Sequence, residues 1–263
     1  MGVGLALIVA ATAAAAAFAG STGQSKAGKQ NLDTKTLIVA VSSDIQNLDP
    51  TLSSADVATQ ELLTNVYDWL IDYKVVNRGG VPYGSPNEFV GAIAQSFSYN
   101  KNRTVVTFHL RKGVKFANGD PIDAAAVKYT YDRIFKQAGV TAALTSMAAV
   151  KDNNAVKVVN PTTVRFDLTK ANTLLFGNMA QFGHSILDPK VVKPHETAKD
   201  PYAHDWLSTN IDGTAQGPFL LDSWQRGSQW VLKANPNYYG QKPKVDRVIF
   251  KIIPNASSRL ALL

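Results

Sequence analysis

The stretch 104–133 (TVVTFHLRKGVKFANGDPIDAAAVKYTYDR) limits the possible folds of this 263-residue chain more than any other segment. Its first seven side chains alternate in the manner of a half-buried strand, and the apolar face carries Val106, Phe108 and Leu110. A basic turn, a second short strand and a turn at Asn118-Gly119 are expected next. Asp123 then precedes three alanines, where its carboxylate can accept the free N–H groups of a helix start. The stretch therefore predicts a strand, a turn region and a capped helix.

Composition narrows the class of protein. The chain is 45% hydrophobic and 18% charged, as expected for a globular protein with a substantial core. It has no cysteine, which excludes disulfides, thiolate zinc sites and cysteine nucleophiles. The net charge is +7, and the densest basic group consists of Lys101, Arg103, Arg111, Lys112 and Lys115. We interpret this group as a solvated rim of a hairpin rather than a nucleic-acid patch, so no nucleic-acid partner is expected.

The N-terminal segment has the features of an export signal. Residues 3–19 are uncharged and apolar and end in Ala17-Phe18-Ala19, an A-x-A cleavage site. The following residues resemble a bacterial lipobox, but Ser21 stands where the lipid-bearing cysteine would be. We therefore predict a signal peptide at 1–19, a flexible linker at 20–35 and an extracytoplasmic protein without a lipid anchor.

Periodicity predicts the remaining elements. The apolar run 36–41 and the stretch 245–253 are expected to be buried strands, and Asn255 is expected to cap a short helix. A hairpin is predicted around Asn160-Pro161-Thr162. The segment 173–182 is expected to be a helix, whereas 74–88 is expected to be a loop because it contains three glycines and two prolines.

No pattern in the sequence demands catalysis. The G-x-S-x-G, H-E-x-x-H, EF-hand and Rossmann patterns are all missing. The four histidines are never three or four residues apart, so no helical metal pair exists and no cofactor is expected. Asp44 and Asp49 lie in an irregular segment, and their local chemistry favours turn and capping roles. We therefore do not expect an enzyme.

Several motifs carry a resemblance to a known family. The sequence TFHLRKGVKF at 107–116, the pair LDP and VYDWL near the N-terminus, and GTAQGPF and NPNYYG near the C-terminus resemble the signatures of family 5 extracytoplasmic solute-binding proteins. These are the oligopeptide, dipeptide and nickel receptors of ABC importers. The resemblance covers residues 36–263.

The resemblance implies an α/β fold: a periplasmic-binding-protein-like type II lobe with a mixed sheet, helices and a small α+β subdomain. We expect 36–70 and 205–263 to form the core of the N-terminal lobe and 71–204 to form an inserted subdomain. In the family a second lobe follows. The short helix after Asn255 stops without a cap, so we expect this chain to be a truncated product without its C-terminal lobe.

The implied function is solute capture for an ABC permease, with a peptide as the default ligand and a monomer as the expected state. Such receptors close two lobes on a ligand. The residues that the resemblance places at the ligand cleft are Asp44, Asn47, Ser53, Tyr83, His184 and Ser185.

Other ligands and functions stay open at this point. A nickel chelate, an oligosaccharide or an opine would also suit the family. An exported hydrolase with scattered catalytic residues is one alternative function, and a basic envelope protein that binds an anionic polymer is another.

Overall fold

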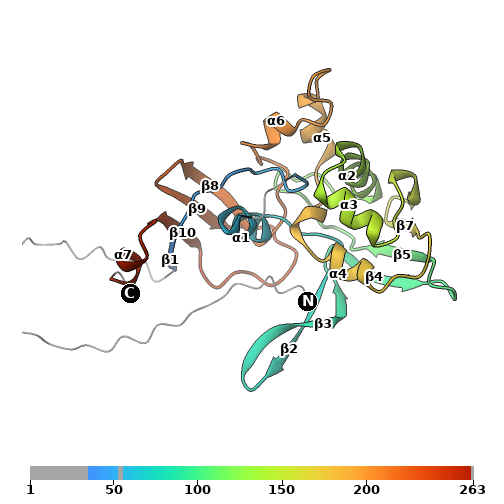
Figure 1. Ribbon diagram of the computed structural model, residues 1–263, viewed down its shortest axis with the longest axis horizontal. Helices are drawn as coiled ribbons and strands as arrows, with labels where there is room; N and C mark the ends of the chain where they lie inside the picture. The colour runs from blue at the N-terminus through green and yellow to red at the C-terminus, as the bar shows by residue number, and fades with distance from the viewer. Residues whose placement is uncertain (1–34, 53–55, 262–263) are drawn as a thin grey trace, which may run out of the picture.

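The computed structural model describes residues 35–52 and 56–261, and the predicted signal peptide and most of the linker lie outside this part. The described residues form three sheets and several helices, with the larger sheets at opposite ends of the molecule (Figure 1). This mixed α/β architecture confirms the predicted fold class.

The first large sheet joins the two ends of the described chain. Its strand order is β1, β10, β9 and β8, with bounds Thr36–Val41, Arg247–Ile252, Gln229–Ala234 and Phe219–Gln225. Strands β1 and β10 are parallel, with Thr36 opposite Arg247, and the other pairs are antiparallel. Helix α1 (Val57–Val66) lies beside this sheet, and Asp56 caps it by accepting a hydrogen bond from the Thr59 amide at 2.8 Å.

The second large sheet is entirely antiparallel and includes the strand predicted at 104–110. Its order is β4, β5, β7 and β6, with bounds Ala94–Tyr99, Val105–Leu110, Thr163–Asp167 and Val156–Asn160. Val106, Phe108 and Leu110 are all buried, which confirms the predicted alternation. The expected second short strand is reduced to a single bridge between Lys115 and Pro121.

Helix α2 (Ala124–Gln137) covers the second sheet, as its capped sequence predicted. The Asp123 carboxylate accepts a hydrogen bond from the Ala126 amide at 2.9 Å. On the buried side of the helix, the Tyr131 ring packs edge-on against Phe166 of β7 with 4.7 Å between centroids. Helix α3 (Val140–Met147) follows directly.

The prediction of a loop at 74–88 is wrong. Strands β2 (Ile71–Arg78) and β3 (Val81–Gly91) form a two-stranded hairpin that projects from the rest of the molecule (Figure 1). Gly79 and Gly80 make its turn with φ of 60° and 87°, a conformation that favours glycine. The prolines are compatible with this hairpin because each strand of a two-stranded ribbon has one open edge. A residue without an N–H group at that edge need not remove a hydrogen bond between the strands.

The remaining helices are short. They are α4 (Leu174–Met179), α5 (Pro189–Val192), α6 (His204–Leu207) and α7 (Ala256–Leu260). Helix α4 covers part of the predicted helix 173–182, which ends early and is followed by a 3-10 turn at Phe182–His184. Asn255 caps α7 as expected, because its side chain accepts the Ser258 amide at 2.9 Å.

Two hydrophobic cores organise the described residues. One surrounds the first sheet and α1 and draws on residues 45–67 and 187–250. The other lies between the second sheet and α2 and draws on residues 70–186. The chain therefore passes from one core to the other near Leu70 and returns near Ile186.

Gln216 links the two places where the chain passes between the cores. Its side-chain amide donates to the backbone oxygens of Asp68 and Ile186, both at 3.0 Å. Gly217 then lies against the end of α1. A Cβ atom there would come within 2.6 Å of the Val66 carbonyl carbon, so the close approach requires glycine.

Candidate functional site

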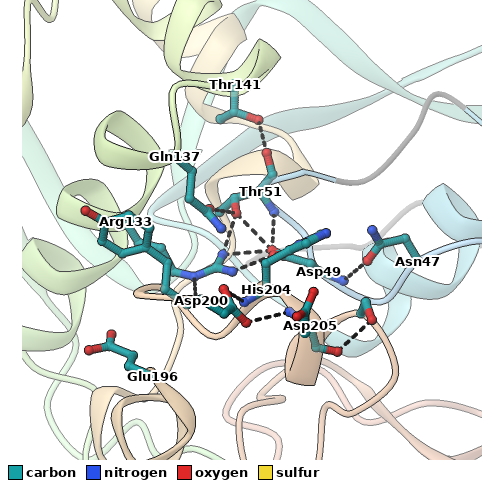
Figure 2. A network of polar contacts seen from close by, with 12 residues as sticks. Asn47, Asp49, Thr51, Arg133, Gln137, Thr141, Glu196, Asp200, His204 and Asp205 are labelled. Atoms are coloured by element: carbon teal, nitrogen blue, oxygen red, sulfur yellow. Dashed lines mark hydrogen bonds and ion pairs between the residues drawn. The ribbon is translucent and has the colours of Figure 1, made fainter. Parts of the chain in front are cut away.

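The segment 42–52 follows β1 and reaches helix α2, where a fully buried carboxylate anchors its far end. Asp49 forms an ion pair with Arg133 of α2, and neither side chain is exposed. The guanidinium donates through Nη1 to Asp49 Oδ1 at 2.8 Å and through Nη2 to Oδ2. A buried charge is tolerated only when it is paired and hydrogen-bonded, and this fork-to-fork geometry meets both conditions (Figure 2).

Neighbouring groups complete the network around Asp49. The Thr51 amide donates to Oδ1 at 3.0 Å, and the Thr51 hydroxyl oxygen lies 2.9 Å from the same atom. His204 Nδ1 lies 2.8 Å from Oδ2. Burial raises the Asp49 pKa, but the hydrogen bonds from Arg133 and His204 outweigh it and hold this pKa far below its usual range. The carboxylate is therefore ionised at physiological pH.

Arg133 ties three segments of the chain together. Its Nε donates to the backbone oxygen of Tyr202 at 2.8 Å, just before α6, while its other nitrogens hold Asp49. Beside it, Gln137 accepts a hydrogen bond from the Thr51 hydroxyl at 2.7 Å, and the Thr141 hydroxyl donates to the Thr51 carbonyl at 3.1 Å. The segment 42–52 is thus fixed to α2, α3 and α6 (Figure 2).

His204 is the exposed member of the network, with about a third of its side chain accessible. Its hydrogen bond with Asp49 raises the imidazole pKa above the ordinary value of 6.5. The Asp200 carboxylate holds the start of α6 by accepting the His204 amide at 2.8 Å.

Asp44 anchors the near end of the same segment. Its Oδ1 accepts hydrogen bonds from Trp224 Nε1 at 2.9 Å and from the Ile45 amide at 2.8 Å. Its Oδ2 accepts the Gly227 amide at 2.7 Å. Because Trp224 and Gly227 belong to the β8–β9 hairpin, Asp44 fixes the segment to the first sheet.

Between these anchors the segment offers polar groups to solvent. Ser42, Ser43 and Gln46 are exposed, and Asn47 is half-buried and accepts the Asp49 amide at 2.7 Å. A backbone held at both ends with exposed polar groups between can present fixed donors and acceptors to a ligand. Of the predicted site residues, Asp44 and Asn47 lie here, and Ser53 lies outside the described residues.

The other predicted site residues lie elsewhere. Tyr83 is on the projecting hairpin, where the Arg78 guanidinium stands 4.6 Å from its ring centroid. His184 and Ser185 are buried at the end of the second core. His184 contacts Tyr131 Oη and Asn178 Nδ2, each at 3.1 Å, and Ser185 donates to the Phe182 carbonyl at 2.6 Å. None of these contacts of the three residues involves the segment 42–52.

Burial also sets the charge of His184. Desolvation lowers its pKa to about 3, so the imidazole is neutral at any physiological pH.

Sequence reasoning missed the Arg133 network, although a signal was present. Thr130, Arg133 and Gln137 recur at spacings of three and four, which places them on one stripe of α2 next to its apolar face. A polar stripe bordering a buried face predicts a partner of opposite charge from another segment.

A second carboxylate, that of Asp68, is partly buried and lies where the chain first passes between the cores. Tyr239 Oη donates to Asp68 Oδ2 at 2.8 Å, which joins the NPNYYG segment to the residues after α1. Burial raises the Asp68 pKa to about 7, although hydrogen bonds from Tyr239 and Tyr238 act in the opposite direction. This acid therefore titrates near neutrality.

Within the described ranges, no three His, Cys, Asp or Glu side chains are grouped so that they could hold a metal ion. No described helix is long and apolar enough to cross a bilayer.

Comparison with known proteins places these features in a family. Residues 88–263 match the family described as bacterial extracellular solute-binding proteins, family 5 Middle. The probable D,D-dipeptide-binding periplasmic protein DdpA of Escherichia coli is 33% identical over 223 residues, covering 85% of this chain and 40% of that protein. The chain thus spans less than half the length of this relative.

Solved structures agree with the sequence match. The Helicobacter pylori periplasmic binding protein DppA, in complex with the peptide STSA, is similar with a TM-score of 0.71 and 26% identity over 87% of this chain and 44% of that one. MoaA from A. tumefaciens R10, in complex with mannopinic acid, gives a TM-score of 0.71 and 25% identity over 87% and 43% of the two chains. With two thirds of its residues inside the family match, this chain belongs to the bacterial extracellular solute-binding proteins of family 5.

Proposed function

We propose that this chain is part of the substrate-binding component of an ABC importer and that its ligands are peptides. The observation that carries the proposal is the family match over residues 88–263. The peptide assignment is supported by relatives whose names specify dipeptides and by a similar structure that holds a tetrapeptide. The opine complex of another similar protein makes opines the second ligand class to test.

The two cores are proposed to be the core and the inserted subdomain of one lobe. The core would comprise 36–70 and 205–263, and the subdomain 71–204, with 187–203 packing back on the core. A second lobe would complete the cleft, since the chain spans about 40% of the E. coli relative. Ligand capture would then follow closure of two lobes around a hinge.

The segment 42–52 is the proposed cleft rim on this lobe. Asp44 and Asn47 shape it, and the exposed Ser42, Ser43 and Gln46 would face the ligand. Ser53 stays a candidate on the family resemblance alone. Tyr83, His184 and Ser185 remain candidates only if the completed cleft extends over the subdomain, and the last two would also have to become accessible.

The proposal includes export and a membrane partner. Residues 1–19 would act as a cleaved signal peptide, and the mature protein would work as a monomer outside the cytoplasm with an ABC permease. Mass spectrometry of the secreted protein should find its N-terminus near Gly20, and a mature protein that begins at Met1 would overturn this part.

Calorimetry on two proteins tests the ligand assignment. The 263-residue chain should bind D-alanyl-D-alanine and Ser-Thr-Ser-Ala weakly, because one wall alone buries little of a ligand. A chimera that adds the part of the E. coli relative beyond the aligned region should bind at least about 100-fold tighter, a gain of about 3 kcal/mol. Micromolar binding by the short chain without any gain in the chimera would refute the two-lobe proposal.

A further inference from the structure

The subdomain contains a cavity of about 410 Å³ that shares no residue with the segment 42–52. Its size lies within the range of pockets that bind small ligands. The lining comes from β3, β4, the turn after β4 and the start of α4, and comprises Pro86, Asn87, Phe89, Phe97, Tyr99, Arg103, Thr173 and Phe176.

Four aromatic rings form the apolar part of this cavity. Phe176 stands in the middle, with ring centroids 5.5 Å from Phe89, 4.8 Å from Phe97 and 5.1 Å from Tyr99. Phe176 is buried, whereas the other three rings are only half-buried. The exposed parts of these rings are in contact with water, which is unfavourable for apolar surface. A flat apolar or aromatic ligand would remove that surface from water by edge-on or offset contact.

The side chain of Arg103 places a positive charge next to these rings. The Arg103 guanidinium carbon lies 4.8 Å from the Tyr99 ring centroid. Within the described part of the chain, the ion pairs do not include Arg103, and no carboxylate lines the cavity. The cavity therefore has a positive charge without a countercharge beside its apolar surface.

The turn that carries Arg103 is held in an unusual conformation. Arg103 has a φ of 56°, in the left-handed region that non-glycine residues seldom occupy. The Asn100 side-chain oxygen fixes the turn by accepting the Thr104 and Val105 amides at 2.8 and 3.0 Å, and the Asn100 backbone oxygen accepts the Arg103 amide at 3.0 Å. The backbone of Arg103 is thus fixed beside Tyr99, and its exposed side chain reaches the Tyr99 ring from there.

We infer that this cavity is a second binding site, which takes an aromatic carboxylate with its ring against Phe97, Tyr99 and Phe176 and its carboxylate on Arg103. The inference does not depend on the ligand of the cleft, because the two sites have different residues. An aromatic carboxylate can be a free aryl acid or the C-terminus of a peptide that ends in phenylalanine.

Fluorine NMR with 4-fluorophenylacetate tests the site in the full chain. Saturable binding is expected, and the neutral 4-fluorophenylacetamide should bind at least about 5-fold more weakly because it cannot pair with a guanidinium. Equal binding of acid and amide, or no saturation of the acid at millimolar concentrations, would overturn the inference.

Three variants locate the site. Arg103→Asn removes the charge with a side chain that tolerates a positive φ, and it should weaken acid binding at least about 5-fold. Thr173→Trp changes an exposed lining residue and should block the cavity by filling it. Lys101→Gln removes one charge from the same turn but does not line the cavity, so it should leave affinity within about 2-fold. An unchanged affinity in both Arg103→Asn and Thr173→Trp, with native circular dichroism, would exclude the site.

A competition experiment separates the two sources of ligand. Ala-Ala-Phe with a free C-terminus should displace 4-fluorophenylacetate if peptides are accepted, and its C-terminal amide should not. Displacement by the free acid phenylacetate alone would support the site and restrict it to small aryl acids. Equal displacement by the peptide and its amide would contradict the role of Arg103.

Discussion

Arg133 and Asp49 lie 84 residues apart in the sequence and form an ion pair in which neither side chain is exposed to solvent. The pair joins α2, which covers the second sheet, to the segment 42–52, which follows β1 of the first sheet, so a buried charge contact links the two cores.

Removal of Arg133 should therefore destabilise the protein strongly. Arg133→Met leaves the buried Asp49 carboxylate without its main partner, a change that typically costs about 3–5 kcal/mol. Urea denaturation measures the loss. The double variant Asp49→Asn/Arg133→Met should recover part of it, whereas a loss below about 1 kcal/mol in the single variant would mean that water or another cation replaces the guanidinium.

His204 should add a pH dependence to stability. Its hydrogen bond with Asp49 raises the imidazole pKa above 6.5, so the folded protein holds this proton more tightly than the unfolded chain. The contribution is complete below about pH 6.5 and is lost as the pH rises through the folded-state pKa. His204→Gln should flatten the stability profile above pH 6.5, and His109→Gln, on the exposed face of β5, should not.

Asp68 should make the stability of the fold depend on pH in a lower pH range than His204 does. Burial raises its pKa to about 7 from 3.8, so the folded protein binds this proton more tightly and stability falls as the pH rises from about 4 to 7. Asp68→Asn keeps an acceptor for Tyr239 but cannot ionise, and it should gain about 1–3 kcal/mol relative to the parent protein between pH 4 and pH 8. Parallel stability profiles for the two proteins would show that Asp68 does not titrate in this range.

Asp44 should control the rigidity of the segment 42–52. Asp44→Ala removes the acceptor of the Trp224 indole and of the Gly227 amide, and unpaired donors of this kind cost about 1–3 kcal/mol when buried and less when solvated. Hydrogen exchange at the Gly227 amide should accelerate at least about 10-fold. Asp246→Asn, at an exposed ion pair with Lys35, serves as the control and should leave this amide unchanged.

The sequence was most informative where local chemistry decides structure. Asp123, the alternation through Val106 and Phe108, and Asn255 each act through neighbours a few residues away, and all three predictions were confirmed. The hairpin at 71–91 was missed because its glycines and prolines are typical of loops, whereas the pairing of β2 with β3 depends on contacts between strands.

The candidate site was harder to predict for the same reason. Asp49 looks like a turn residue in the sequence, and its partners Arg133 and His204 come from distant segments. Asp44 and Asn47 were predicted from the resemblance alone, and their contacts with the β8–β9 hairpin and the Asp49 amide are properties of the folded chain that the sequence does not show. Their role toward a ligand remains a prediction.

The parallel pairing of β1 with β10 has a consequence for biosynthesis. Thr36 pairs with Arg247, so β1, the first of the described strands to be synthesised, can pair with β10 only after Arg247 has been translated. At about 5–20 residues per second, that wait is on the order of ten to forty seconds. Strand β1, close to the proposed signal peptide, is therefore still unpaired while translation proceeds. An unpaired, extended chain is the form that can pass through a secretion channel.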